Sequence, residues 1–386
     1  GEVLNLLNLA INKFAFIDVF GGEVTLVGER DHTVDMVVRI ADNVKATLIF
    51  QNANFKGATE TTVQIGSGCQ VTVVLEGDNT LHKEGILVPP TSSLLMIGDG
   101  NLNILASRND GVGIGANYKS PYGSMTFDLT GKVSIDASGD KVAGIGGGKM
   151  VKESIRMLNG TFEVEAKGIS VVGIGSASGN ADIQVENAHL KVHCAGDEAV
   201  SIGSISGRVK LRSTGFIETI TDSERAVGIG SLSGRESELH FTRGRVKAIN
   251  HCLISTCIGS FDGSIAIYCT GAVVDIYGEG STIAGIGSLK GRAQTIISGG
   301  TLCESFLAGS VLACGNEQCQ LTINGGNVLA EGLDLHAKNL FGMPLTPVMV
   351  EEEQFEKQID TELGSYIYRA KRDEDHSQLC VYLPEA

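Results

Sequence analysis

The stretch VGIGSLSGR, Val227–Arg235, recurs almost unchanged as AGIGSLKGR, Ala284–Arg292. Looser copies of its GIG core lie elsewhere in the chain, and we take the central isoleucine of each copy as an anchor. The anchors follow one another at a nearly constant interval, and a degenerate copy has Cys314 in the anchor position. A regular interval of about 28 residues is the signature of a solenoid of stacked repeats. The anchors are Ile114, Ile145, Ile174, Ile202, Ile229, Ile258 and Ile286.

Each repeat also contains short runs in which apolar and polar residues alternate, such as Val133–Asp136 and Leu190–His193. Alternation with a period of two is typical of β-strands, and the glycine, serine and asparagine between the runs supply turns. Three short strands and their turns fill about 28 residues. The sequence therefore predicts an all-β fold, a parallel β-helix with three strands per coil. Parallel β-helices of this coil size are usually right-handed, and we expect that hand.

The residues on either side of each anchor are nearly always glycine, in twelve of fourteen positions, with Ser201 and Cys257 as the exceptions. Strand residues alternate between two faces, so we expect the isoleucines to stack inward and the glycines to form a bare outer strip. Glycine in a strand costs about 0.5–1 kcal/mol relative to alanine, so something must offset it. Either the local backbone requires glycine, because the coil bends sharply or takes dihedral angles that only glycine allows, or the strip receives another surface, for instance in lateral self-association.

The same interval organises the rest of the chain. Ile86 precedes Ile114 by one such interval and is expected to be a further anchor. Residues 1–45 are expected to form an N-terminal cap with the first irregular strands, and residues 46–335 the β-helix repeats. Residues 336–386 break the pattern and predict a small C-terminal cap or β-element, because the open ends of a solenoid need covering.

Composition narrows the range of partners. The formal net charge is −15, which argues against nucleic acid or an anionic membrane surface as a partner, since both bind basic surfaces. No apolar run of about 20 residues occurs, so we expect no membrane insertion.

Nine cysteines are scattered without a CxxC pair, which argues against a zinc site and favours buried free thiols. Free thiols are typical of a reducing compartment, so a cytoplasmic location is an alternative to an extracellular or cell-surface location.

Several phrases outside the strict repeat are distinctive: VTVVLEGDNTL (Val71–Leu81), GILVPPTSSLLMIGDGNLNI (Gly85–Ile104), LTINGG (Leu321–Gly326), AKNLFGMP (Ala337–Pro344) and the closing YIYRA…LCVYLP. Together with the serial GIG motifs, they lie in the same order as in a group of repetitive bacterial surface proteins, common in Gram-positive gut bacteria and labelled carbohydrate-binding domain-containing. Most of the chain resembles that family, although GIGGG has mostly become GIGS here. The resemblance implies a right-handed parallel β-helix like that of polysaccharide lyases, at the cell surface, with a glycan as partner.

Two columns of residues at fixed distances from the anchors could carry function. Six residues after an anchor lie Arg208, Arg235 and Arg292, which would form a basic stripe able to bind the acidic group of a glycan through guanidinium forks. The alternative is that they are solvated turn residues that pair with nearby acids.

Nine residues before an anchor lie Asp136, Glu165 and His193, which we expect to stack in register about 5 Å apart. Two carboxylates at that spacing suit general acid–base catalysis, or calcium binding if more oxygen ligands join. Apart from that calcium option, no metal or cofactor is expected. Because alternation places charge on any exposed strand face, this triad is only a weak catalytic candidate.

The sequence favours a non-catalytic, adhesin-like β-helix that binds a polysaccharide or other glycan. A polysaccharide lyase or glycoside hydrolase on the same fold is the first alternative. A structural spacer that associates with itself through the glycine strip is the second.

Overall fold

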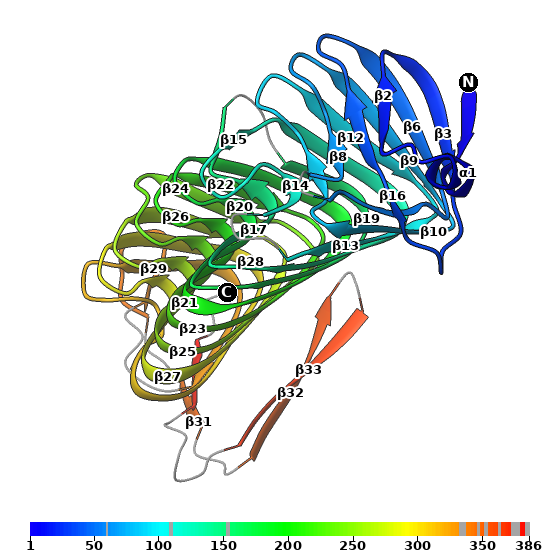
Figure 1. Cartoon of the computed structure of the whole chain (residues 1–386). Helices are drawn as coiled ribbons and strands as arrows, with labels where there is room; N and C mark the ends of the chain where they lie inside the picture. The colour runs from blue at the N-terminus through cyan, green and yellow to red at the C-terminus, as the bar shows by residue number, and fades with distance from the viewer. Residues whose placement is uncertain are drawn as a thin grey trace. The chain divides into compact units, whose positions relative to one another are not determined.

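The computed structural model describes residues 1–58, 61–107, 111–151, 155–331, 337–345, 348–350, 354–361, 364–371 and 379–382. Contacts divide the chain into two compact units, Gly1–Gly196 (unit 1) and Asp197–Ala386 (unit 2). Strands make up 71% of the structure and helix 2%, and the parallel strands form a β-solenoid of about 11 turns with roughly 28 residues each (Figure 1). The predicted all-β solenoid is therefore confirmed.

The elements of unit 1 are mostly short strands. They are β1 (Glu2–Asn5), α1 (Leu6–Ile11), β2 (Phe16–Val19), β3 (Gly22–Val27), β4 (Val34–Asp35), β5 (Val37–Ile40), β6 (Lys45–Gln51), β7 (Asn54–Lys56), β8 (Val63–Gln64), β9 (Gln70–Glu76), β10 (Asp78–Lys83), β11 (Ile86–Leu87), β12 (Ser93–Gly98), β13 (Asn101–Ala106), β14 (Val112–Gly115), β15 (Pro121–Tyr122), β16 (Ser124–Ser138), β17 (Lys141–Gly147), β18 (Lys149–Met150), β19 (Ile155–Lys167), β20 (Ser170–Ser176) and the first part of β21 (Ala181–Ser204).

Unit 2 contains the end of β21, several long strands and a number of short ones. They are β22 (Val209–Ser213), β23 (Phe216–Ser231), β24 (Ser237–Phe241), β25 (Arg245–Ser260), β26 (Ser264–Cys269), β27 (Val273–Ser288), β28 (Arg292–Leu312), β29 (Gln320–Glu331), β30 (Ala337–Lys338), β31 (Val348–Val350), β32 (Gln354–Thr361), β33 (Gly364–Lys371) and β34 (Leu379–Tyr382).

The three strands of each coil in unit 1 build three parallel ladders. The first contains β3, β6, β9, β12, β16 and β19. The second, named sheet 2 below, contains β4, β7, β10, β13, β16, β19 and β21. The third contains β2, β5, β8, β11, β14, β17 and β20. The stretch expected to form a cap, residues 1–45, thus already holds strands that pair in parallel with later coils.

The anchor isoleucines stack in register, as the sequence predicts. All of them are buried, with side chains at most 1% exposed. Stacked aliphatic side chains of one shape fill a column without gaps, which close packing of a core requires. The register pairs are Ile86–Ile114, Ile114–Ile145 and Ile145–Ile174 in unit 1, and Ile229–Ile258 and Ile258–Ile286 in unit 2.

The prediction of a bare outer glycine strip is wrong, because all twelve flanking glycines are buried. The strands that carry the motif, such as β17 and β20, are buried at nearly every position, so both of their faces are covered. Near-continuous burial is typical of parallel strands packed on both sides, and the GIG core of β17 and β20 contains no polar side chain to contradict it. The glycines therefore offer little surface for lateral contact.

The second glycine of each motif is required by backbone geometry. Its φ lies between +123° and +141° in all seven motifs, a region that side chains disfavour. At Gly259, a Cβ would also collide with the carbonyl oxygen of Gly287 on the next coil. Glycine-only backbone angles, the first of the two explanations drawn from the sequence, account for this column.

The serine after the motif closes the turn that follows. Ser231 Oγ accepts a hydrogen bond from the Gly234 amide (2.8 Å), and Ser260 and Ser288 do the same in their own turns. The three serines are register partners along the solenoid. The repeated GIGSxxG pattern is thus an anchor, a glycine-only bend and a side-chain-capped turn in one segment.

One interior position of unit 2 departs from the apolar pattern. Glu304 is fully buried, and its register partners are Ile276 and Ala330. Among the residues that the structure describes, neither carboxylate oxygen has a hydrogen-bond partner. Burial raises the pKa of Glu304 well above its ordinary value, and the nearby Ile286 amide opposes this only in part. The hydrogen bond of that amide goes to Ala313 O (3.0 Å).

The cysteines whose side chains the structure describes are free thiols, as predicted, and all but Cys319 are buried. Burial raises the pKa of Cys252 and of Cys269 to about 12, so both thiols stay protonated and unreactive at neutral pH.

The C-terminal part of unit 2 is a small β-element with antiparallel pairing, as the fold prediction includes. β34 pairs antiparallel with β29 and β31, and β32 forms a hairpin with β33. Among the described residues, no helix is long and apolar enough to cross a membrane.

Candidate functional site

The predicted triad stacks as expected on sheet 2. Asp136 on β16 is the register partner of Glu165 on β19, and Glu165 is the partner of His193 on β21. His193 Nδ1 lies 3.8 Å from Glu165 Oε1, and Lys167 Nζ lies 3.5 Å from Glu165 Oε2. The register confirms the spacing argument, whereas the catalytic role stays a prediction.

The triad is open to solvent. The Glu165 side chain is 48% exposed, the His193 side chain 27%, and Asp136 is exposed as well. Acid–base catalysts are usually shielded from water so that their pKa values are shifted and their charges act strongly. Here Glu165 meets a lysine and a histidine in water, where such pairs contribute little. The geometry resembles a solvated strand face more than an enclosed catalytic centre.

The triad belongs to a longer array on the same sheet. Two rows of outward residues run along it in register, Thr80–Asn103–Ser134 and His82–Leu105–Asp136. We call these six residues the polar face. On β13 the alternation is strict, because Asn101, Asn103 and Leu105 are exposed while the residues between them are buried. Neighbouring strands lie about 4.8 Å apart, so each row repeats at that interval.

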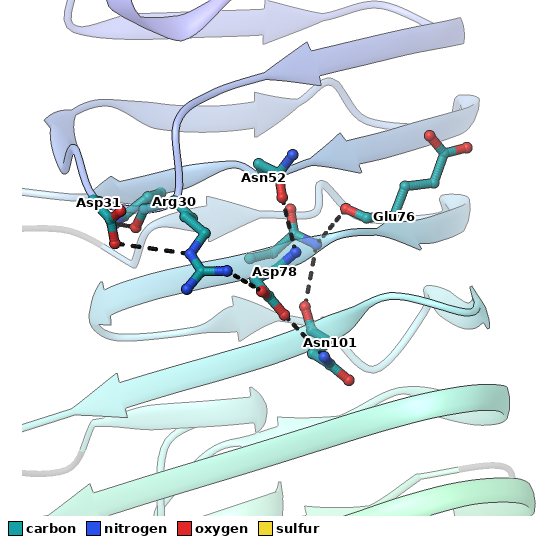
Figure 2. Close-up of polar contacts among 8 residues, drawn as sticks. Arg30, Asp31, Asn52, Glu76, Asp78 and Asn101 are labelled. Atoms are coloured by element: carbon teal, nitrogen blue, oxygen red, sulfur yellow. Dashed lines mark hydrogen bonds and ion pairs between the residues drawn. The ribbon is translucent and has the colours of Figure 1, made fainter.

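Figure 2 shows an ordered polar network that includes Asp78 and Asn101, which lie two positions before Thr80 and Asn103 on the same strands. Arg30, from the loop after β3, donates to Asp78 Oδ2 at the start of β10 (3.1 Å). Asn101 on β13 donates to the other carboxylate oxygen of Asp78 (2.9 Å), and the Asp78 amide donates to Asn52 Oδ1 (3.0 Å). Figure 2 shows Arg30 reaching from its loop toward Asp78, so the network ties this loop to sheet 2.

A second group of contacts joins the same loop to β7 and β10. Asn54 Nδ2 donates to Arg30 O (2.6 Å), and Thr33 Oγ1 donates to Asn54 Oδ1 (2.9 Å). His82 Nε2 lies 2.9 Å from the same oxygen. Burial lowers the pKa of His82, and the nearby Lys56 ammonium lowers it further. His82 is therefore a neutral imidazole at pH 7, held at the edge of the polar face.

The three predicted arginines do not share one line. Ser264 is the register partner of Arg292, and the Glu236 amide donates to Ser264 Oγ. The β22–β24 register, continued by two residues, places Arg208 opposite Glu236, not opposite Arg235. The turn after Ser231 contains one residue more than the next turn, and Glu236 absorbs it with a φ of +56°. The register therefore does not place Arg235 in line with Arg208 and Arg292, and a ligand-binding role for the three arginines stays a prediction.

Sequence reasoning missed an aromatic pair in unit 2. His240 and Tyr268 are register partners whose rings stack at 4.6 Å with an interplanar angle of 16°. The two residues lie one repeat apart in the sequence, and that interval could have indicated the pair. Stacking covers one face of each ring, which leaves less ring surface for contact with a sugar.

No group of three or more potential metal ligands occurs among the described residues.

Comparisons with family models, with curated proteins and with solved structures found no match for this chain.

Proposed function

We propose that this chain is an adhesin-like glycan-binding protein, and that it binds an extended glycan along the polar face of unit 1. The observation that carries the proposal is the in-register repeat of Thr80, Asn103 and Ser134 beside His82, Leu105 and Asp136. A row of hydroxyl and amide groups at a constant interval suits a polymer that also repeats. Leu105, 43% exposed, offers an apolar contact in the middle of the array.

The charges around the polar face favour a neutral glycan. Arg30 pairs with Asp78, Lys56 pairs with Asp35 (3.7 Å), and Lys132 pairs with Glu163 (2.8 Å). Because cations and anions neutralise one another there, the face carries no strong field of one sign for an acidic polymer. The resemblance to bacterial surface proteins supports a glycan partner and a cell-surface location.

We expect the double substitution Thr80→Ala/Asn103→Ala to weaken binding of a neutral oligosaccharide by at least about tenfold. Each lost hydrogen bond is worth about 1 kcal/mol, and a tenfold loss of affinity corresponds to only about 1.4 kcal/mol. The measurement is calorimetric titration with oligosaccharides that a glycan screen selects, on wild type and variant. Gln294→Ala on the exposed face of β28 in unit 2 is the control. Equal affinity of wild type and the double variant would contradict this placement of the site.

A polysaccharide-degrading enzyme is the second candidate, supported by the stacked carboxylates Asp136 and Glu165. An enzyme would release sugar products from the polysaccharide, whereas a binding protein would not. Release of reducing ends or of unsaturated sugars from a bound polysaccharide, lost in Glu165→Gln, would favour the enzyme over the binding protein.

A further inference from the structure

The corner of the polar face where loop 28–33 meets β7 and β10 is more tightly built than the rest. Glu29 and His32 form a β-bridge that closes the loop on itself, and the His32 amide donates to Glu29 O (3.0 Å). Arg30 then spans to Asp78, two coils away along the chain. The loop is therefore held against sheet 2 at both its backbone and its side chains.

The hydrogen bonds in this corner determine which nitrogen of His82 carries the proton. Asn54 is 6% exposed, and its Nδ2 faces the Arg30 carbonyl, which can only accept. Asn54 Oδ1 must therefore be the atom that faces Thr33 and His82, and it too can only accept. His82 Nε2, 2.9 Å from that oxygen, is the donor. In the neutral imidazole this leaves Nδ1 as an acceptor.

Lys56 and the partial burial of the ring oppose a second proton on His82. Lys56 is its register partner on β7, while its partner on β13 is the uncharged Leu105. Desolvation keeps the pKa of His82 below its ordinary value, and Lys56 adds to the effect. The charged or titratable groups on the elements packed around this corner are Glu29, Arg30, Asp31 and His32 of the loop, Asp35 on β4, Lys56 on β7, and Asp78 and Lys83 on β10.

We propose that this corner is a hydroxyl-recognition subsite, in which His82 Nδ1 accepts a hydrogen bond from a glycan hydroxyl and releases the glycan in acid. The inference rests on the proposed function and adds a regulated contact to it. A hydroxyl donor needs an acceptor, and protonation of Nδ1 removes the acceptor and places a second cation beside Lys56. Binding is then full above the pKa of His82 and weakens as the pH falls through it. Below that pKa, a single linked proton lowers affinity by up to about tenfold per pH unit.

The first test is calorimetric titration between pH 7.5 and pH 4.5 with the neutral oligosaccharide selected by the screen. Wild type should lose affinity in the acid range, whereas His82→Gln should bind more weakly at pH 7.5 and show a flat profile. His251→Gln is the control, since His251 lies in unit 2 and pairs with Asp222 (3.0 Å). A pH dependence that survives in His82→Gln would overturn this inference and leave the proposed function standing. No binding by wild type at pH 7.5 would overturn both.

The second test needs no ligand. Nitrogen-15 NMR of labelled histidine at pH 7 should show His82 protonated at Nε2 and unprotonated at Nδ1. A ring that carries its proton on Nδ1, or on both nitrogens, would overturn the inference whatever the binding data show.

Discussion

Gly259→Ala is expected to destabilise the protein by about 2–5 kcal/mol, the sum of a left-handed backbone penalty and an overpacking penalty. Gly259 has a φ of +141°, and a Cβ there would collide with the backbone of Gly287 on the next coil. Neither neighbour can move alone, because every coil is hydrogen-bonded to the next. The measurement is the midpoint of chemical denaturation, compared with wild type.

Gly22→Ala separates the two parts of this effect. Gly22 also has a positive φ, +76°, but nothing lies within 4 Å of the place that its Cβ would take. We expect it to cost only about 1–2 kcal/mol, from backbone strain alone. Equal losses in the two variants would contradict the explanation that coil-to-coil contact selects glycine in the repeated motif.

Glu304→Gln is expected to stabilise the protein at high pH, by about 1.4 kcal/mol for each pH unit that separates the unfolded pKa of Glu304 from the folded one. The folded-state pKa of Glu304 is raised above its unfolded value of about 4.5. The native protein therefore holds this proton more tightly than the unfolded chain does. The contribution of the protonated Glu304 to the stability of the folded state is complete below the unfolded pKa and is lost as the pH rises through the folded pKa.

The gap between the free energies of unfolding of Glu304→Gln and wild type should thus be small near pH 4 and grow with pH. Denaturation series at several pH values measure it. Glu317→Gln, at an exposed position beyond the same strand, is the matched control and should show no such growth. A gap that does not change with pH would mean that the carboxyl group of Glu304 is not buried as an acid.

The fold could be predicted from the sequence because one motif recurs at a constant interval. Ile229 and Ile258 lie one repeat apart in the sequence and prove to be register partners, so the interval alone located the coil. The same reasoning placed Asp136 beside Glu165, because strand segments between two anchors keep their length. Parallel pairing converts equal spacing in sequence into contact in space.

Counting residues from the anchor did not locate the arginines, because one turn is longer than the others. Arg235 lies six residues after Ile229, as predicted, but the turn before β24 contains one extra residue, at Glu236. Only the φ of +56° at Glu236 reveals which residue is inserted. The burial of the glycines was also misjudged, although the unbroken apolar run around Ile145 already indicated a strand covered on both faces.

The corner around His82 had no signal in the sequence. Arg30 and Asp78 are 48 residues apart and lie outside the repeated motifs, so no interval connects them. Their contact depends on the path of loop 28–33, which the alternation of apolar and polar residues does not describe. Such loop contacts carry much of the specificity of binding proteins and are the part that needs coordinates.

The central claim, glycan binding by the polar face, is tested most directly by a glycan array probed with wild type, Asn103→Trp and Gln294→Trp. Asn103 lies in the middle of the polar face, and an indole there would block an extended ligand, whereas Gln294 lies on unit 2. We predict that wild type and Gln294→Trp bind the same neutral glycan and that Asn103→Trp does not. Unchanged binding by Asn103→Trp, or no binding by wild type at high protein concentration, would contradict the account.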